Sequence, residues 1–191
     1  MTLTSLLDDP GATLARIRAH VAALTPADRV AECRSIAAKH QERLWELASA
    51  APTGVDGQLV PAGEATATFM GRNSLRAFSH FEKRFARQGA DVVGRNVHPL
   101  GWLIGPGYFL VDQGVHGGRI RFDYSRVPTE VPAGWPTPSD NKSSMFARAV
   151  YGDLLDKVLW ITADVLIGAA FRRGLPLGSY FVLARSAADA L

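Results

Sequence analysis

The apolar residues of the first fifty positions recur at helical spacing. After Pro10 they stand three or four residues apart, as on one face of a helix, at Leu14, Ile17, Val21 and Leu24. Thr25 and Pro26 then supply an N-cap and a first-turn proline for a second helix, which is predicted to end near Ala50. The apolar stripe of this second helix comprises Val30, Cys33, Ile36, Ala37, Leu44 and Leu47. Residues 1–50 are therefore expected to form a helical hairpin.

A third helix is predicted between Asn73 and Arg87. Asn73 or Ser74 would cap it, and Gly89 would end it. Its apolar arc comprises Leu75, Phe78, Phe81 and Phe85. At about 100° per residue, four basic side chains gather on the opposite side, namely Arg72, Arg76, Lys83 and Arg87. This helix is expected to have one apolar face and one cationic face.

Strand signals follow the third helix. Short apolar runs at 102–104 and 108–111 predict two strands. Residues 119–124 alternate between apolar and polar, which is typical of an antiparallel strand with one face in water. The apolar stretch 144–172 predicts a long helix, and residues 179–184 predict a closing strand.

These elements predict one α+β domain over residues 1–191. It would comprise an N-terminal helical hairpin at 1–50, a third helix, a small antiparallel sheet of three to five strands, a long C-terminal helix and a closing strand. The Gly- and Pro-rich residues 51–63 form the expected loop between the hairpin and an α+β core at 64–191. A parallel βαβ arrangement is disfavoured because the expected strands cluster instead of alternating with helices.

The composition fits a folded domain and excludes several classes. With 191 residues, 47% hydrophobic and 20% charged, the chain has enough apolar content to bury one core, so disorder of the whole chain is excluded. The net charge of +3 argues against a dedicated nucleic-acid-binding protein. Cys33 is the single cysteine, which excludes an internal disulfide and a multi-cysteine zinc site.

No targeting or membrane segment is expected. The first nine residues lack the basic cluster and apolar run of a secretory leader. Asp156, Lys157 and Asp164 interrupt the most apolar stretch, and three charges are too costly for a bilayer centre. Together with the unpaired cysteine, this predicts a cytoplasmic protein. The preference for arginine over lysine is typical of a GC-rich, bacterial coding sequence.

The basic edge of the third helix is the first candidate binding site. Two Gly-Arg-Asn triplets flank this helix, and they are expected to hold a carboxylate or phosphate through Arg72, Asn73, Arg76 and Arg95. A solvated helix face is the alternative. Short repeats also arise by chance in a chain rich in glycine and arginine.

An apolar pocket between the sheet and the long helix is the second candidate site. Residues 127–141 contain four prolines and are predicted to form an extended loop that carries Trp135 across this pocket. The candidate ligand contacts are His98, Tyr108, Tyr124 and Trp135. A packed core is the alternative explanation of these aromatic residues.

We therefore predict a protein that binds a small anionic or apolar molecule in this pocket, with the basic edge holding an anionic group. The alternative is a protein-interaction module that uses the basic helix face and the N-terminal hairpin, through which a homodimer is also expected. An enzyme of unknown class is the third hypothesis, with His98, Asp123 or Tyr124 as acid–base groups. The sequence contains no phosphate-loop, HExxH or G-x-S-x-G motif, identifies no cofactor and predicts no metal site.

Overall fold

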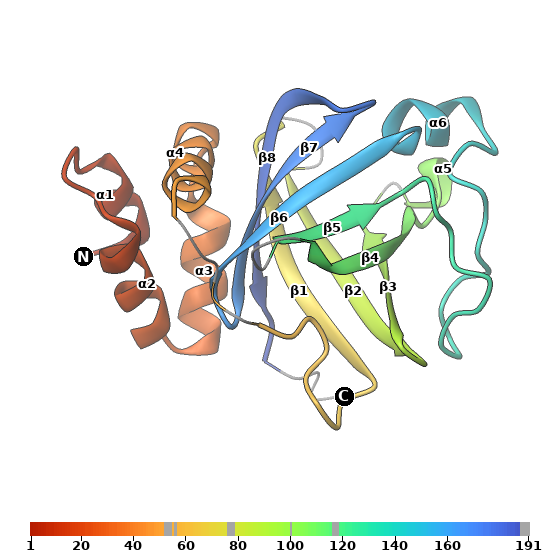
Figure 1. Cartoon of the computed structure of the whole chain (residues 1–191), viewed down its shortest axis with the longest axis horizontal. Helices are drawn as coiled ribbons and strands as arrows, with labels where there is room; N and C mark the ends of the chain where they lie inside the picture. The colour runs from red at the N-terminus through yellow and green to blue at the C-terminus, as the bar shows by residue number, and fades with distance from the viewer. Residues whose placement is uncertain (52–54, 56, 76–78, 100, 116–118, 188–191) are drawn as a thin grey trace.

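The protein is a closed antiparallel β-barrel with helices around it (Figure 1). This computed structural model describes residues 1–51, 55, 57–75, 79–99, 101–115 and 119–187. The strands are β1 (Thr66–Asn73), β2 (His80–Gln88), β3 (Asp91–Val97), β4 (Tyr108–Val115), β5 (Arg119–Asp123), β6 (Leu154–Thr162), β7 (Val165–Arg172) and β8 (Leu175–Arg185). Each strand pairs with the next in chain order, and β8 closes the barrel against β1. The predicted α+β fold with a sheet of three to five strands is therefore wrong.

The helices in the described residues are α1 (Leu3–Asp8), α2 (Leu14–Ala23), α3 (Pro26–Ser35), α4 (Ala38–Ser49), α5 (Gly101–Ile104) and α6 (Met145–Tyr151). Helices α1, α2, α3 and α6 each begin after a Thr or Ser whose side chain caps the first turn. The Thr25 side chain caps α3 by accepting a hydrogen bond from the backbone N–H of Asp28, as expected. The predicted second helix is nevertheless two helices, because Ile36 and Ala37 between α3 and α4 have extended backbones.

The third helix predicted over residues 73–87 is wrong, because Asn73 is the last residue of β1 and residues 80–87 belong to β2. Along β2, Phe81, Lys83 and Phe85 face the barrel interior and alternate with the outward-facing Glu82 and Arg84. The spacing of the phenylalanines fits a helical arc as well as a two-residue alternation. The strand forms because pairing with β1 on one side and β3 on the other satisfies its backbone hydrogen bonds.

The long helix predicted over residues 144–172 is also wrong. Its first part forms α6, and the rest forms β6 and β7. Val158 and Leu166 point into the barrel core, whereas Ile161 and Ile167 point outward against the N-terminal helices. Because both faces of these strands are buried, the segment lacks the alternation that marks a half-exposed strand.

Other local predictions have mixed outcomes. The strands expected at 108–111, 119–124 and 179–184 are confirmed as parts of β4, β5 and β8. The strand expected at 102–104 is wrong, since this segment lies in α5. Residues 127–141 contain neither helix nor strand, which confirms the extended loop.

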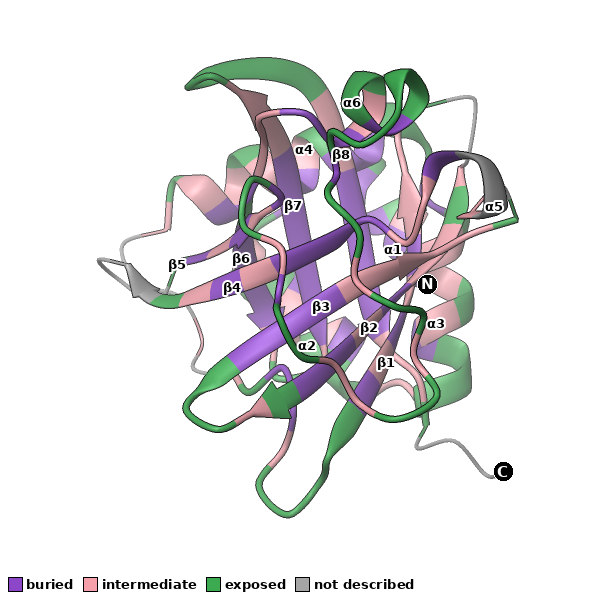
Figure 2. Cartoon of the chain, turned by 90° about the vertical axis from the view of Figure 1, so that its right-hand side faces the viewer, coloured by how far each residue is buried: buried purple, intermediate pink, exposed green. Residues whose placement is uncertain are grey.

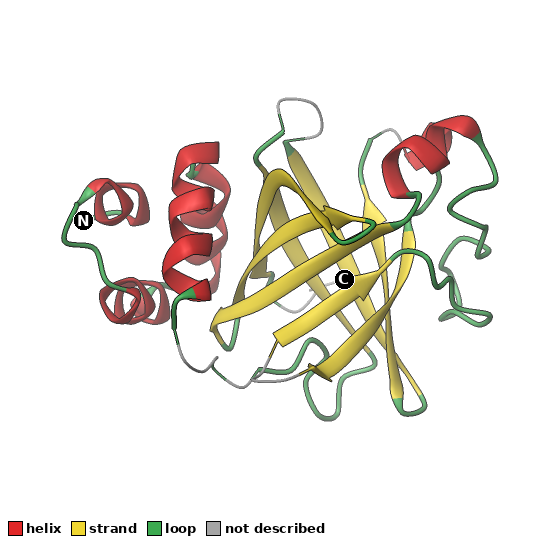
Figure 3. Ribbon diagram, turned by 45° about the horizontal axis from the view of Figure 1, so that its top comes forward, coloured by secondary structure: helices red, strands yellow, loops and turns green. Residues whose placement is uncertain are grey.

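Helices α1 to α4 pack against one side of the barrel (Figure 3). Helix α3 contacts β1 and β8, α4 contacts β6, β7 and β8, and α2 contacts β6. The buried faces of these helices include Leu3, Ile17, Cys33 and Leu44, which share a core with outward-facing side chains of the barrel. Most of the apolar stripe of the predicted hairpin is thus buried or half-buried within the chain, whereas Ala37 is exposed. Dimerisation through these helices stays a prediction.

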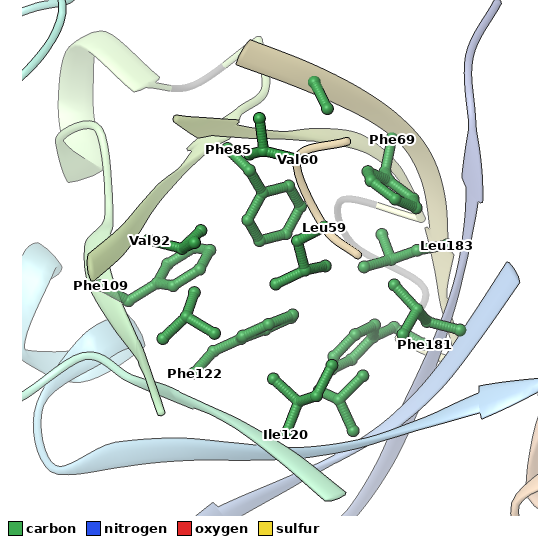
Figure 4. Close-up of a cluster of buried hydrophobic side chains, with 14 of the residues drawn as sticks. Leu59, Val60, Phe69, Phe85, Val92, Phe109, Ile120, Phe122, Phe181 and Leu183 are labelled. Atoms are coloured by element: carbon green, nitrogen blue, oxygen red, sulfur yellow. The ribbon is translucent and has the colours of Figure 1, made fainter. Parts of the chain in front are cut away.

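The barrel interior is filled at one end and hollow at the other. Phe69, Phe85, Phe109 and Phe122 point into the filled part, and Leu59 and Val60 close its end from the segment before β1 (Figure 4). Figure 2 shows the buried positions concentrated along the middle of the strands, with exposed residues in the loops. Near α5 and α6 the packing leaves a cavity.

Candidate functional site

The cavity has a volume of about 180 Å³ and mostly apolar walls. Phe81 and Phe181 line it from β2 and β8, while Ile104 of α5 and Tyr151 of α6 line it from the helices. At its edge lies Leu75, which is 53% exposed. The cavity therefore reaches from the surface into the barrel.

Four polar side chains lie together at the base of the cavity, and we call Lys83, Asn96, Tyr124 and Asp156 the polar cluster. Lys83 Nζ donates hydrogen bonds to Asn96 Oδ1 at 2.7 Å and to Tyr124 Oη at 2.5 Å. It forms an ion pair with Asp156 Oδ2 at 3.6 Å. Tyr124 Oη also donates to Asp156 Oδ2, at 3.4 Å. The side chains of Lys83 and Asp156 are only 3% and 5% exposed, so the ion pair is almost fully removed from water.

Strand register places these residues together. Lys83 of β2 stands directly opposite Asn96 of β3, so their side chains share one face of the sheet. Asp156 of β6 stands opposite Phe122 of β5, and Tyr124 follows Phe122 by two positions. Side chains two positions apart point to the same face of a strand. All four groups therefore point inward, although they come from three strands and the end of a fourth.

Aromatic rings surround the ammonium group of Lys83. Its Nζ lies 4.7 to 5.5 Å from five ring centroids, those of Phe81, Phe109, Phe122, Tyr124 and Phe181. Rings at this distance attract a cation through their negative faces. They also exclude water, so the carboxylate and the neighbouring polar atoms are the main groups that compensate the buried charge.

Burial brings the pKa values of the ion pair toward neutrality. Desolvation lowers the pKa of Lys83 to about 8, and the nearby Asp156 opposes this shift. Desolvation raises the pKa of Asp156 to about 6, opposed by Lys83. Burial also holds the pKa of Tyr124 well above its usual value of 10.0, so its hydroxyl remains protonated. At neutral pH the pair is ionised, and its uncharged form is accessible.

The hydrogen-bonded groups extend from the polar cluster toward the outside. The Tyr124 ring stacks on the Tyr151 ring, with 5.4 Å between centroids and 4° between planes. Tyr151 Oη and His98 Nε2 are 3.0 Å apart. Burial, and then the charge of Lys83, lower the pKa of His98, so its ring is neutral at pH 7. These groups can orient a polar ligand along one wall of the cavity.

Two of the predicted arginines, Arg72 and Arg95, lie apart on the barrel wall. Arg72 Nη1 donates to the backbone carbonyl of Arg34 on α3, at 2.8 Å. Arg95 of β3 pairs with Arg84 of β2, and Arg84 pairs with Thr68 of β1. Arg95 therefore lies at the same height on the barrel wall as Thr68. Arg72 lies four residues further along β1, a separation of about 13 Å along the strand direction alone.

Arg95, Tyr108 and Trp135 gather outside the barrel, beneath the proline-rich loop. The Arg95 guanidinium lies 5.1 Å from the centroid of the Trp135 ring, which stacks on Tyr108. Tyr108 Oη donates to the carbonyl of Pro136 at 2.5 Å, and Asn141 Nδ2 donates to the carbonyl of Tyr108 at 2.7 Å. These contacts attach the loop to the barrel wall, on the side away from the cavity.

Asn73, His98 and Tyr124 do line the cavity, so the structure brings three of the predicted contacts together. Arg76 lies outside the described residues. Asp123, named as an acid–base group, accepts hydrogen bonds from the turn that follows it and does not line the cavity. Ligand binding by any of these residues stays a prediction.

Sequence reasoning missed Lys83, Asn96 and Asp156 as site residues. The predicted third helix has Lys83 on its basic face, although Lys83 stands at the central position of an alternating Phe-x-Lys-x-Phe run. Asp156 was considered only as a charge that excludes a membrane span. A charged residue at an inward position of an alternating pattern was the available signal.

Comparisons of the chain with protein-family models, with curated proteins and with solved structures find no match. None of the helices in the described part of the chain has the length and apolar content needed to cross a bilayer. Within the same residues, no three His, Cys, Asp or Glu side chains form a group able to hold a metal ion. The proposed function therefore rests on the geometry of the cavity and the polar cluster.

Proposed function

We propose that the protein binds a small, mainly apolar molecule inside the barrel, with one polar group of the ligand directed at the polar cluster. The observation that carries this proposal is the cavity of about 180 Å³ with a buried ion pair at its base. An apolar cavity of roughly 150 Å³ suffices to hold benzene. The expected ligand is therefore a substituted ring or a short aliphatic chain.

The buried ion pair supports a binding role over a purely structural one. Replacing a buried ion pair by apolar residues often leaves stability unchanged or raises it. The attraction between Lys83 and Asp156 is therefore expected to do little more than offset the desolvation cost of burying their charges. Their charges cancel, which favours a neutral hydroxyl or carbonyl group on the ligand. An anionic ligand would face the carboxylate of Asp156 unless that carboxyl were protonated.

Benzyl alcohol is the test ligand, because its ring suits the apolar walls and its hydroxyl can pair with Tyr124 or Asn96. Calorimetric titration is expected to show one site with a Kd on the order of 0.2 mM, a reasonable value for a ligand of this size. Toluene should bind more weakly, since it has no hydroxyl that can form a hydrogen bond with the polar cluster.

The variant Ala170→Phe tests where the ligand binds. Ala170 lines the cavity, so the larger side chain would occupy the ligand volume. Ala133→Phe adds the same bulk at an exposed loop position and serves as the control. Benzyl alcohol should bind the control as it binds the unchanged protein and should not bind Ala170→Phe. Equal binding by the two variants, or no binding by the unchanged protein, would contradict the proposal.

A further inference from the structure

Resting on the proposed function, we infer that this cavity binds aldehydes covalently, as an imine with Nζ of Lys83. The proposal depends on the position of this amine. Lys83 Nζ lies at the base of the cavity, between a carboxylate at 3.6 Å and a phenol hydroxyl at 2.5 Å. An amine held between a proton acceptor and a proton donor has the surroundings that imine formation requires.

The choice of lysine at this position supports the inference. The chain contains four lysines among its 21 basic residues. Lys39 and Lys142 have side chains that are 70% and 46% exposed, and Lys157 is also exposed. An arginine would supply charge and more hydrogen bonds, but it remains protonated and cannot act as a nucleophile. The buried position thus carries lysine, the basic residue type whose neutral amine can react with a carbonyl group.

The chemistry proceeds in two steps with water as the single product released. In its neutral form, Lys83 Nζ uses its lone pair to form a bond to the carbonyl carbon, and the π electrons of the carbonyl move to its oxygen. A proton transferred from nitrogen to this oxygen gives a carbinolamine. The hydroxyl of Tyr124 protonates the carbinolamine hydroxyl, which leaves as water while the nitrogen lone pair forms the C=N bond, and Tyr124 then regains its proton from the solvent.

The site is built to hold the resulting iminium ion. Its positive charge replaces that of the ammonium group, so the carboxylate of Asp156 remains its counter-ion. The five surrounding rings attract the iminium as they attract the ammonium. Because the cavity base is nearly dry, hydrolysis of the imine is slowed.

The neutral amine is available near physiological pH. Burial lowers the pKa of Lys83 to about 8, so about half of its amine is neutral at that pH, against roughly 0.4% for an exposed lysine. The titratable groups that face it are Asp156 of β6 and Tyr124 after β5, with His98 and Tyr151 at the outer part of the network. Asp156 is ionised and the other three groups are neutral at pH 8. The charge of Asp156 therefore stays constant while the Lys83 amine loses its proton.

Reductive trapping of the unchanged protein tests the inference. Benzaldehyde at pH 8 with cyanoborohydride converts an imine into a stable benzylamine, which peptide mass mapping locates. We expect at least about tenfold more benzyl group at Lys83 than at Lys39, in line with the difference in neutral fraction. The rate at Lys83 should rise with pH and level off above about pH 8, whereas that at Lys39 should still be rising.

Competition distinguishes this inference from the proposed function and needs no variant. Excess benzyl alcohol should slow labelling of Lys83 and leave Lys39 unaffected. If benzyl alcohol binds but benzaldehyde labels only the exposed lysines, the cavity is a reversible site and the imine is wrong. If Lys83 is labelled although benzyl alcohol neither binds nor competes, the reactive amine stands and the reversible site fails. Lys83→Met should lose the label, and Lys39→Met, the matched control, should keep it.

Discussion

The ring of Phe181 lies directly against the backbone of Gly168 on the neighbouring strand. A Cβ atom added at Gly168 would lie 2.1 Å from Phe181 Cζ. The same arrangement places Phe109 against Gly94 and Phe81 against Gly71, each pair directly opposite across two strands. Because these rings lie close to the barrel wall, the barrel centre keeps room for the Lys83 side chain and for the cavity.

Gly168→Ala should destabilise the protein, because the Phe181 ring must leave its place against β7. We expect a loss of about 1–3 kcal/mol in the free energy of unfolding, the usual cost of overpacking, measured by urea denaturation. Gly101→Ala is the control, since nothing lies within 4 Å of its added Cβ. Phe181→Leu in the Gly168→Ala background should recover part of the loss. Equal stability of Gly168→Ala and the control would show that the ring moves without cost.

Lys83→Met should lower the free energy of unfolding far more than removal of the charges of both Lys83 and Asp156. The single variant leaves the Asp156 carboxylate buried without its cation, which costs about 3–5 kcal/mol. The double variant Lys83→Met with Asp156→Leu should regain most of this stability, since it leaves no buried charge. Urea denaturation of the four proteins forms a double-mutant cycle. Additive effects of the two substitutions would mean that the pair does not act as a unit.

The ion pair should make stability depend on pH in two separate windows. The pKa of Asp156 is raised from 3.8 to about 6, so the folded state binds more protons below pH 6, and stability rises as the pH falls from 6 toward 4. The pKa of Lys83 is lowered from 10.5 to about 8, so the unfolded state binds more protons above pH 8, and stability rises from pH 8 toward 10.5.

The double variant isolates this pH dependence from that of the other titratable groups. The free energy of unfolding of the unchanged protein, minus that of Lys83→Met with Asp156→Leu, should be lowest between about pH 6 and 8. It should increase on either side of this range. A difference that is constant from pH 4 to 10 would contradict the pKa shifts of the pair.

Asp164→Asn should weaken the attachment of the helices to the barrel. Asp164 lies in the turn between β6 and β7, and its carboxylate accepts from Arg29 of α3 at 2.6 Å and from Arg185 of β8 at 3.0 Å. Arg185 also donates to the carbonyl of Leu59, in the segment that closes the barrel end. Since both arginine side chains are largely buried, we expect a loss of about 2–3 kcal/mol in urea denaturation.

Asp153→Asn is the matched control for this prediction. Asp153 also joins two basic side chains, Lys142 and Arg173, but these are 46% and 80% exposed. Asparagine tolerates the positive φ of 53° at this position. Exposed ion pairs contribute little, so the loss should stay below about 1 kcal/mol. A larger loss of stability for Asp153→Asn than for Asp164→Asn would contradict the prediction that the ion pairs of Asp164 attach the helices to the barrel.

Local signals were sufficient for the helix start at Thr25 and for the alternating strand that contains Ile120 and Phe122. In both places residues close in sequence decide the structure. At Thr25 this is a side-chain cap, and in the strand it is the alternation between a solvent-exposed face and a buried face. The sequence misled where a strand is buried on both faces, as around Val158 and Ile167. It also misled at Phe81 and Phe85, whose spacing fits two periodicities, and the choice between them depends on pairing partners far along the chain.

By itself, the amino-acid sequence showed enough apolar content for a buried core, ruled out an internal disulfide, contained none of the common catalytic motifs, and located the N-terminal helices and three of the strands. Closure of the barrel decided the remaining strands and the position of the polar cluster. Inward positions of β2, β3 and β6 are separated by many residues, and only the strand register brings Lys83, Asn96 and Asp156 within hydrogen-bonding and ion-pairing distance. The physical reason is that a strand's inward side is set by all of its neighbours, whereas a helix cap is set by the residues beside it.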